Sequence, residues 1–126
     1  MSQDLVSDTL NNIMNAKGAR KNAVVVKRHS KLLLNLLDIM KERGYIEGYK
    51  LNEAEKTLEI KLGKLNRCNS IKPRFYVSTK TIEKYIRRYL PAKDFGILII
   101  STDKGLITHD EAIEKNIGGS MVAYIF

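Results

Sequence analysis

The sequence predicts an α+β protein made of two small lobes, and three observations carry this prediction. The chain has 126 residues, 44% of them hydrophobic and 29% charged, which allows a modest buried core without disulfides. Apolar residues recur at helical spacing in some segments and alternate in others, so helices and strands are interspersed. A polar and basic stretch over residues 63–70 separates two groups of such elements. We therefore expect an N-terminal lobe over 1–64 and a C-terminal lobe over 65–126.

The N-terminal lobe is expected to follow the order helix, strand, helix, strand, strand. Val6, Leu10 and Ile13 repeat at the spacing of one helix face, and a β-branched run follows as a short strand. Ser30 stands where an N-cap hydroxyl would begin the second helix. The predicted elements are a helix over 3–17, a strand over 23–26, a helix between Ser30 and Gly44, and two hairpin strands over 45–51 and 57–62.

The C-terminal lobe is expected to follow the order strand, helix, strand, strand, helix, strand. Ile82, Ile86 and Leu90 form a buried helical stripe, and the apolar run over 97–100 is typical of a central strand. The predicted elements are an edge strand over 71–77, a helix capped by Ser78 or Thr79 and ended by Pro91, strands over 97–100 and 106–107, a short helix that begins with a capping box over 108–111 and is ended by Gly118 and Gly119, and a final strand over 121–126.

Positive charge is concentrated in two segments of the chain. The net charge is +8, whereas residues 17–31 carry +6 and residues 61–88 carry +8, so the rest of the chain is net negative. A basic surface on an otherwise acidic protein repels itself, and a polyanionic partner relieves that repulsion. We therefore expect a nucleic-acid partner rather than a role for the bases in solubility alone.

Several classes of protein are not expected. No apolar run is long enough to cross a bilayer, and the first residues lack the features of a secretory signal. A single cysteine, Cys68, favours a reducing cytosol, and nothing brings it together with His29 or His109 and a third orienting group. Phosphate-binding glycine loops and zinc-ligand spacings are absent. We expect a cytoplasmic protein that is not an enzyme and has no cofactor, metal, small-molecule substrate or membrane partner.

The turn over residues 101–105 is a candidate contact surface. It follows a buried strand, so the core fixes its position, and it presents two hydroxyls, a carboxylate, an ammonium and a glycine. These groups suit phosphates, ribose hydroxyls and base edges of an irregular RNA. The alternative is an ordinary hairpin, because Asp103, Lys104 and Gly105 are good turn residues by themselves.

A longer pattern resembles one known family. Residues 101–112, 117–120 and 123–126 resemble the C-terminal signature of the small-subunit ribosomal protein S-eight family. The segments that resemble its archaeal and eukaryotic branch are Cys68, residues 71–75, residues 88–92 and residues 95–97. The resemblance extends over the whole chain, and it includes Asn12 and residues 30–32 near the N-terminus.

The resemblance implies a structural component of the small ribosomal subunit in the cytoplasm. Such a protein is a primary binder of small-subunit ribosomal RNA, attaches to an irregular helix in the central domain, helps assemble the platform, and contacts neighbouring ribosomal proteins. The bases of a regular A-form duplex are hard to reach, so bulged bases, shape and ribose hydroxyls must supply the specificity. Alternatives are a free-standing RNA-binding translational regulator and a protein-interaction module whose basic faces meet acidic partners.

The resemblance also implies which residues contact RNA. In the C-terminal lobe they are Ser101, Thr102, Asp103, Lys104, Gly105, Thr108, His109, Gly118, Gly119 and Ser120. A second set of predicted contacts comprises Asn11, Asn15, Lys27, Ser30, Lys31, Lys72 and Arg74, for whose bases plain solvation is the alternative. Asp103 stands where the family usually has a hydroxyl residue; its carboxylate repels phosphate but can accept from a base amine. Phe75 and Tyr76 could stack on a splayed base or pack between the lobes.

Overall fold

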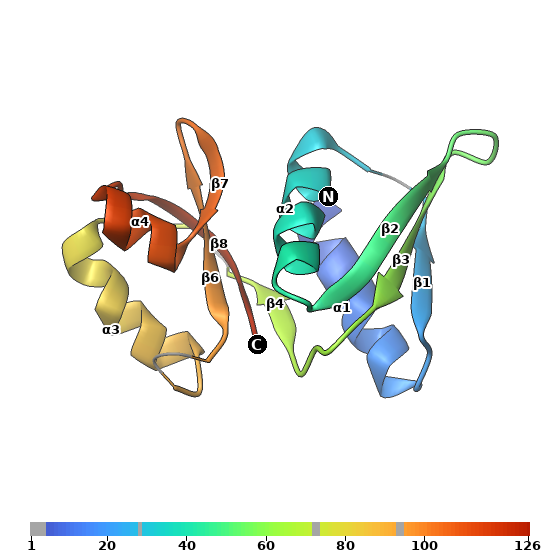
Figure 1. Ribbon diagram of the computed structural model, residues 1–126, viewed down its shortest axis with the longest axis horizontal. Helices are drawn as coiled ribbons and strands as arrows, with labels where there is room; N and C mark the ends of the chain where they lie inside the picture. Colours follow the sequence, from blue (N-terminus) through green and yellow to red (C-terminus); the bar gives the residue numbers. More distant parts are fainter. Residues whose placement is uncertain (1–4, 28, 72–73, 93–94) are drawn as a thin grey trace. The chain divides into compact units, whose positions relative to one another are not determined.

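The structure is a computed structural model that describes residues 5–27, 29–71, 74–92 and 95–126 (Figure 1). It contains helices and antiparallel sheets, which confirms the predicted α+β class. The chain divides into two compact units, Met1–Cys68 and Asn69–Phe126. The first is called the N-terminal lobe below and the second the C-terminal lobe. The strand β4 (Cys68–Ser70) spans the division between them.

The N-terminal lobe has two helices on one face of a three-stranded sheet (Figure 1). Its elements are α1 (Leu5–Gly18), β1 (Ala23–Val26), α2 (Lys31–Glu42), β2 (Ile46–Asn52) and β3 (Thr57–Leu62). The sheet order is β1-β3-β2, with both pairings antiparallel. Leu58 and Ile60 of the central strand are fully buried, while Glu59 between them is exposed. The period of two predicted from the sequence therefore sets the buried face of the sheet.

The two helices bury the apolar stripes that the sequence indicates. The side chains of Leu10 and Ile13 on α1 are fully buried, as are those of Leu33, Leu36 and Leu37 on α2. The helix α2 begins as predicted, because the Ser30 hydroxyl accepts a hydrogen bond from the Leu33 amide at 3.2 Å.

The C-terminal lobe has a larger antiparallel sheet. Its remaining elements are β5 (Tyr76–Val77), α3 (Thr79–Tyr89), β6 (Ile97–Thr102), β7 (Gly105–Thr108), α4 (His109–Lys115) and β8 (Gly119–Ile125). The strands run in the order β4-β8-β6-β7, and β5 also pairs with β8. The helix stripe of Ile82 and Ile86 packs into one core cluster with Leu98 and Ile100 of β6. The continuous apolar run of β6 thus lies inside the sheet, as the sequence predicts.

The pairing of β8 with β6 contains a bulge. Ile99 pairs with Ala123, and the next residue, Ile100, pairs with Met121, so Val122 has no opposite residue on β6. Such an extra residue shifts the register of every pair beyond it by one.

Two predicted boundaries in this lobe are wrong. Of the edge strand predicted over 71–77, only β5 is a strand, while a second short strand, β4, lies before the predicted range, and both pair with β8. Residues 72 and 73 lie outside the described part of the chain. The helix α4 ends at Lys115 and not at the two glycines, because Asn116 takes the left-handed C-cap conformation at φ 55°. Asparagine tolerates that conformation, and Gly119 is left free to begin β8.

We expect Leu37→Ala to lower the free energy of unfolding by ~2–5 kcal/mol, because the fully buried side chain leaves a cavity under α2. Urea denaturation of the two proteins measures the difference. A conservative control is Leu51→Ala, since Leu51 is 37% exposed and should cost far less. Equal losses for the two variants would contradict the assignment of Leu37 to the core.

Candidate nucleic-acid interface

An open groove of about 400 Å³ lies on the C-terminal lobe, and two distant segments of the chain form most of it, with Tyr76 of β5 beside them. One segment is the end of β6 with the turn that follows, and the other is the start of β8. The lining residues are Tyr76, Ser101, Thr102, Asp103, Lys104, Ile117, Gly118, Gly119 and Ser120. Seven of these nine residues belong to the predicted contact set; Tyr76 and Ile117 do not.

Three hydroxyl side chains form a row across the groove. Ser101 on β6 pairs with Ser120 on β8, and Ser120 pairs with Tyr76 on β5. Residues directly opposite in an antiparallel sheet project from the same face. None of the three hydroxyls has a hydrogen-bond partner in the part of the chain that the structure describes. We call Ser101, Ser120 and Tyr76 the hydroxyl row.

Tyr76 is 71% exposed, more than any other large apolar or aromatic residue among those that the structure describes. Its neighbour Phe75 behaves differently, because the Phe75 ring packs against Tyr85 with the centroids 4.9 Å apart. The sequence left two alternatives for Tyr76, stacking on a splayed base or packing between the lobes. Stacking on a base needs an accessible ring, and the Tyr76 ring is accessible. A signal for this in the sequence is its position one residue before buried Val77, since neighbouring strand residues project to opposite faces.

Two glycines allow the three strands to approach each other at the groove. A Cβ atom on Gly119 would lie 2.3 Å from the Ser101 carbonyl oxygen, and one on Gly118 would lie 2.6 Å from the Val77 carbonyl oxygen. Real Cβ atoms do not come so close to backbone oxygens, so any larger residue would push β8 away from its neighbours. The predicted residues Gly118 and Gly119 therefore position the hydroxyl row.

The tip of the turn is held by Thr102. Its hydroxyl donates to the Gly105 carbonyl oxygen at 2.9 Å and accepts from the Lys104 amide at 3.2 Å. Gly105 has a φ of 112°, which glycine adopts without strain. The side chains of Asp103 and Lys104 are exposed at this tip. Thr102 thus orders the turn, and the charged pair beside it faces solvent.

Two predicted contact residues lie inside the lobe. His109 is only 3% exposed; its Nδ1 accepts from the Leu98 amide at 3.1 Å, and its Nε2 lies 3.1 Å from the Asp110 carboxylate. Thr108 is 1% exposed and its hydroxyl caps α4 by accepting from the Glu111 amide at 3.5 Å. The His109 side chain therefore joins α4 to β6, and the Thr108 side chain caps the start of α4.

The predicted residues of the N-terminal lobe lie on its surface with one exception. Asn11 and Asn15 are exposed on α1, and Lys27 and Lys31 are exposed at either end of the segment between β1 and α2. Ser30 is partly buried and its hydroxyl serves as the N-cap of α2. In the C-terminal lobe Arg74 is exposed, whereas Lys72 lies outside the described residues.

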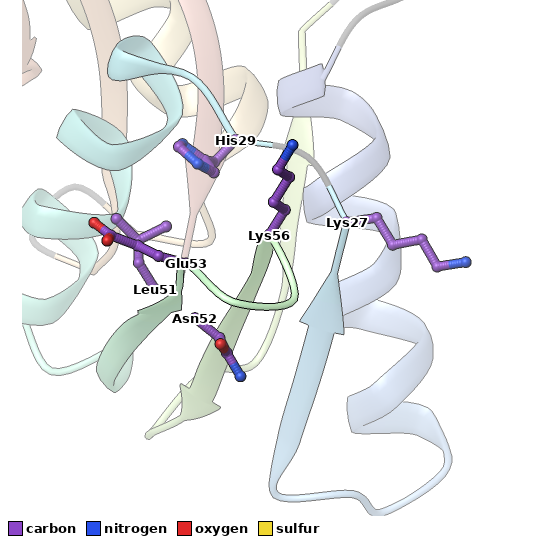
Figure 2. Close-up of a pocket in the computed structure, with 6 residues that line it drawn as sticks. All are labelled: Lys27, His29, Leu51, Asn52, Glu53 and Lys56. Carbon is purple, nitrogen blue, oxygen red and sulfur yellow. The ribbon is translucent and has the colours of Figure 1, made fainter.

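Lys27 also lines a shallow pocket beside the β2–β3 turn, together with His29, Leu51, Asn52, Glu53 and Lys56 (Figure 2). Figure 2 shows the Lys56 side chain rising toward the segment that carries His29, while Lys27 points away from the turn. Charges of both signs meet here, since Glu53 lines the same pocket. The pocket therefore lacks the uniform positive potential that a phosphate site needs.

The chemistry of Cys68 is that of a structural residue. Its side chain is buried, and its Sγ lies 3.7 Å from the Leu10 carbonyl oxygen. Burial raises the pKa of the thiol to about 12, so the thiol stays protonated at neutral pH. Within residues 5–27, 29–71, 74–92 and 95–126, no three His, Cys, Asp or Glu side chains are grouped as metal ligands would be. The helices among these residues are each too short or too polar to traverse a bilayer.

An open, hydroxyl-lined groove with a charged tip, on a basic α+β chain, is typical of proteins that bind structured RNA. Comparison with known proteins identifies which of them this chain resembles. The family described as ribosomal protein S8 matches residues 4–126. The small ribosomal subunit protein uS8 of Nanoarchaeum equitans is 43% identical over an alignment that covers all of both chains. The chain belongs to the ribosomal protein S8 family, which confirms the predicted family and a location in cytoplasmic ribosomes.

We expect Gly119→Ala to destabilise the protein by ~1–3 kcal/mol, because the added methyl group would overlap the Ser101 carbonyl oxygen. Urea denaturation checks the value. Gly18→Ala is the matched control, since a Cβ atom on Gly18 meets no atom within 4 Å and should cost nothing. If Gly119→Ala is as stable as the unmodified protein, the close approach of β8 and β6 is not a constraint.

Proposed function

We propose that this protein is a primary binder of small-subunit ribosomal RNA, that it holds an irregular helix of the central domain in its C-terminal groove, and that it thereby helps to assemble the platform. The chain's family is that of a small-subunit ribosomal protein. The observation that carries the proposal is the hydroxyl row, three unpaired hydroxyl side chains aligned across β6, β8 and β5. A surface of this kind matches the chemistry of RNA better than that of a protein partner.

The hydroxyl row suits the ribose and base edges of a distorted stem. A hydroxyl both donates and accepts, so Ser101 and Ser120 can pair with a ribose 2′-OH or with either kind of base group. The exposed Tyr76 ring offers a face on which an unstacked base can lie. A regular A-form duplex provides no such base, because its bases stay stacked and its major groove is narrow. The groove therefore favours an irregular helix.

Charged side chains around the groove have separate roles in the proposal. Lys104 at the tip and Arg74 near β5 contact phosphates, and Asp103 accepts from a base amine or a ribose hydroxyl. Asn11, Asn15, Lys27 and Lys31 supply further contacts from the surface of the N-terminal lobe. Lys72 belongs with them on the strength of the sequence alone.

Some residues in the predicted contact set act through the fold. Thr102, Thr108, His109 and Ser30 use their side-chain polar atoms within the protein, and Gly105, Gly118 and Gly119 shape the backbone. We propose that these residues position the groups that bind RNA. The contacts themselves come from the hydroxyl row, from Asp103 and Lys104 at the tip of the turn, and from the surface residues named above.

The double variant Ser101→Ala with Ser120→Ala should weaken binding of a central-domain transcript by ~1–3 kcal/mol, since two hydrogen bonds to RNA are lost. Tyr76→Leu should weaken it by a similar amount through lost stacking, while Tyr76→Phe keeps the ring, loses only one hydroxyl of the row and should weaken binding less. Fluorescence anisotropy at fixed salt measures each affinity, and a regular RNA duplex serves as the reference. Full affinity in both the double variant and Tyr76→Leu, with intact folds, would refute the groove as the binding site.

In cell extracts the protein should sediment with small ribosomal subunits at about one copy each, and RNase digestion should release it. This outcome follows from a structural role on RNA. A protein found mainly in fractions lighter than the subunit would instead act as a free-standing regulator, and one that keeps its partners after digestion would be held by proteins.

A further inference from the structure

The outward face of α3 carries a stripe of cations that the groove does not use. Lys80, Lys84 and Arg88 follow each other at intervals of four residues, so they lie in one row along the helix. The buried residues Ile82 and Ile86 are offset from this row by two positions, or about 200° around the helix. The cationic stripe is therefore directed away from the core.

The charges of the stripe are not neutralised by the protein. The one carboxylate of the helix, on Glu83, pairs with Arg87 at 3.5 Å. Lys80, Lys84 and Arg88 have no carboxylate partner among the residues that the structure describes. Three exposed cations at successive turns of one helix repel each other, and an anionic partner relieves that repulsion.

Aromatic rings hold two of the three cations in place. The Lys84 ammonium lies 5.8 Å from the centroid of Tyr85, and the Arg88 guanidinium lies 5.8 Å from the centroid of Tyr89. Cation–π contacts of this length restrain long side chains along the helix. Less conformational entropy is then lost when a partner binds them.

The stripe begins beside the groove. A Cβ atom on Gly118, which lines the groove, would lie 3.2 Å from the Cα of Ser78, the N-cap of α3. The hydroxyl of Thr79, the first residue of α3, donates to the side-chain oxygen of Asn116 at 2.8 Å, two residues before Gly118. The N-terminal end of α3 is therefore the end that lies near the groove, and Lys80 is the cation of the stripe at that end.

We propose that the outward face of α3 is a second RNA-binding surface of the C-terminal lobe and grips the sugar–phosphate backbone of the RNA segment that leaves the groove. The proposal rests on the proposed function of the groove. Successive cations rise about 6 Å along the helix axis, so the stripe follows a strand over about 12 Å. Contacts of this kind fix position and carry no sequence information.

An acidic protein is a poorer match for the stripe than a phosphate backbone. The centres of protein–protein interfaces are depleted in charged residues, Lys among them, and enriched in aromatic residues, Met and Arg. Two of the three residues of the row, Lys80 and Lys84, are of the depleted type. The tyrosines beside it lie half-buried against the core rather than presenting a free apolar patch.

The double variant Lys80→Gln with Lys84→Gln tests the proposal. It should bind the central-domain transcript about tenfold more weakly at physiological salt, and the slope of log affinity against log salt should become shallower by about 2. The variant Lys80→Arg with Lys84→Arg keeps the charge and should bind normally. The matched control is Lys50→Gln with Lys61→Gln, which removes the same charge from the exposed sheet face of the N-terminal lobe and should change affinity less than twofold.

A tethered cleavage reagent locates the RNA directly. The native thiol of Cys68 is buried with a raised pKa, so a Lys84→Cys variant has one reactive thiol for an iron chelate. Cleavage should fall on RNA adjoining the nucleotides cut from a chelate at Lys104→Cys. No RNA cleavage from position 84, or an unchanged affinity and salt slope in the Lys80 and Lys84 double variant, would overturn the proposal.

The outcomes separate the stripe from the groove. If the hydroxyl-row variants lose affinity and the Gln double variant on α3 does not, the groove stands and the stripe is not an RNA contact. A loss as large in the Lys50 and Lys61 control would mean that net charge alone is responsible, which also overturns the proposal. If the α3 variants and the hydroxyl-row variants all bind normally, the proposed function of the groove fails as well.

Discussion

The close approach of three backbones at Gly118 and Gly119 is the constraint on which the candidate site depends. The strand β8 lies between β6 and β5, and a side chain at either glycine would overlap a neighbouring carbonyl oxygen. Because β8 can sit so near both neighbours, Ser101, Ser120 and Tyr76 come into one row. Because Gly118 and Gly119 have no side chains, those of the hydroxyl row can form one surface. Nothing in the hydroxyl row itself could compensate for a displaced β8, since the row is made by pairing alone.

The polar residues of the C-terminal lobe divide according to where their hydrogen bonds go. Thr102, Thr108 and His109 are engaged within the fold and stabilise the turn, the start of α4 and its contact with β6. The hydroxyl row has no hydrogen-bond partner among the described residues, and Lys80, Lys84 and Arg88 of α3 have no carboxylate partner among them. A polar group that is already paired gains little from a new partner, because it must first give up the old one. Unpaired groups on a rigid support are those that a ligand can bind at low cost.

Much of the fold could be predicted because local patterns and tertiary packing agree. The stripes of α1 and α2, the alternation in β3 and the apolar run of β6 each identify both an element and its buried face. The short polar strand β4 escaped prediction since Cys68, Asn69 and Ser70 have no strand pattern, and pairing with β8 alone makes them a strand. In the site, the place of Tyr76 depends on which strand β5 pairs with. The burial of His109 depends on the hydrogen bond that its Nδ1 accepts from the Leu98 amide. Both are properties of the assembled sheet.

The bulge at Val122 has a consequence for the chemistry of the groove. If Val122 paired with Ile100 and the bulge were absent, the register that pairs Ile99 with Ala123 would continue and bring Met121 opposite Ser101. A thioether would then replace a hydroxyl at the centre of the groove, and Ser120 would turn toward the opposite side of the sheet. The bulge therefore selects which residues of β8 the groove displays.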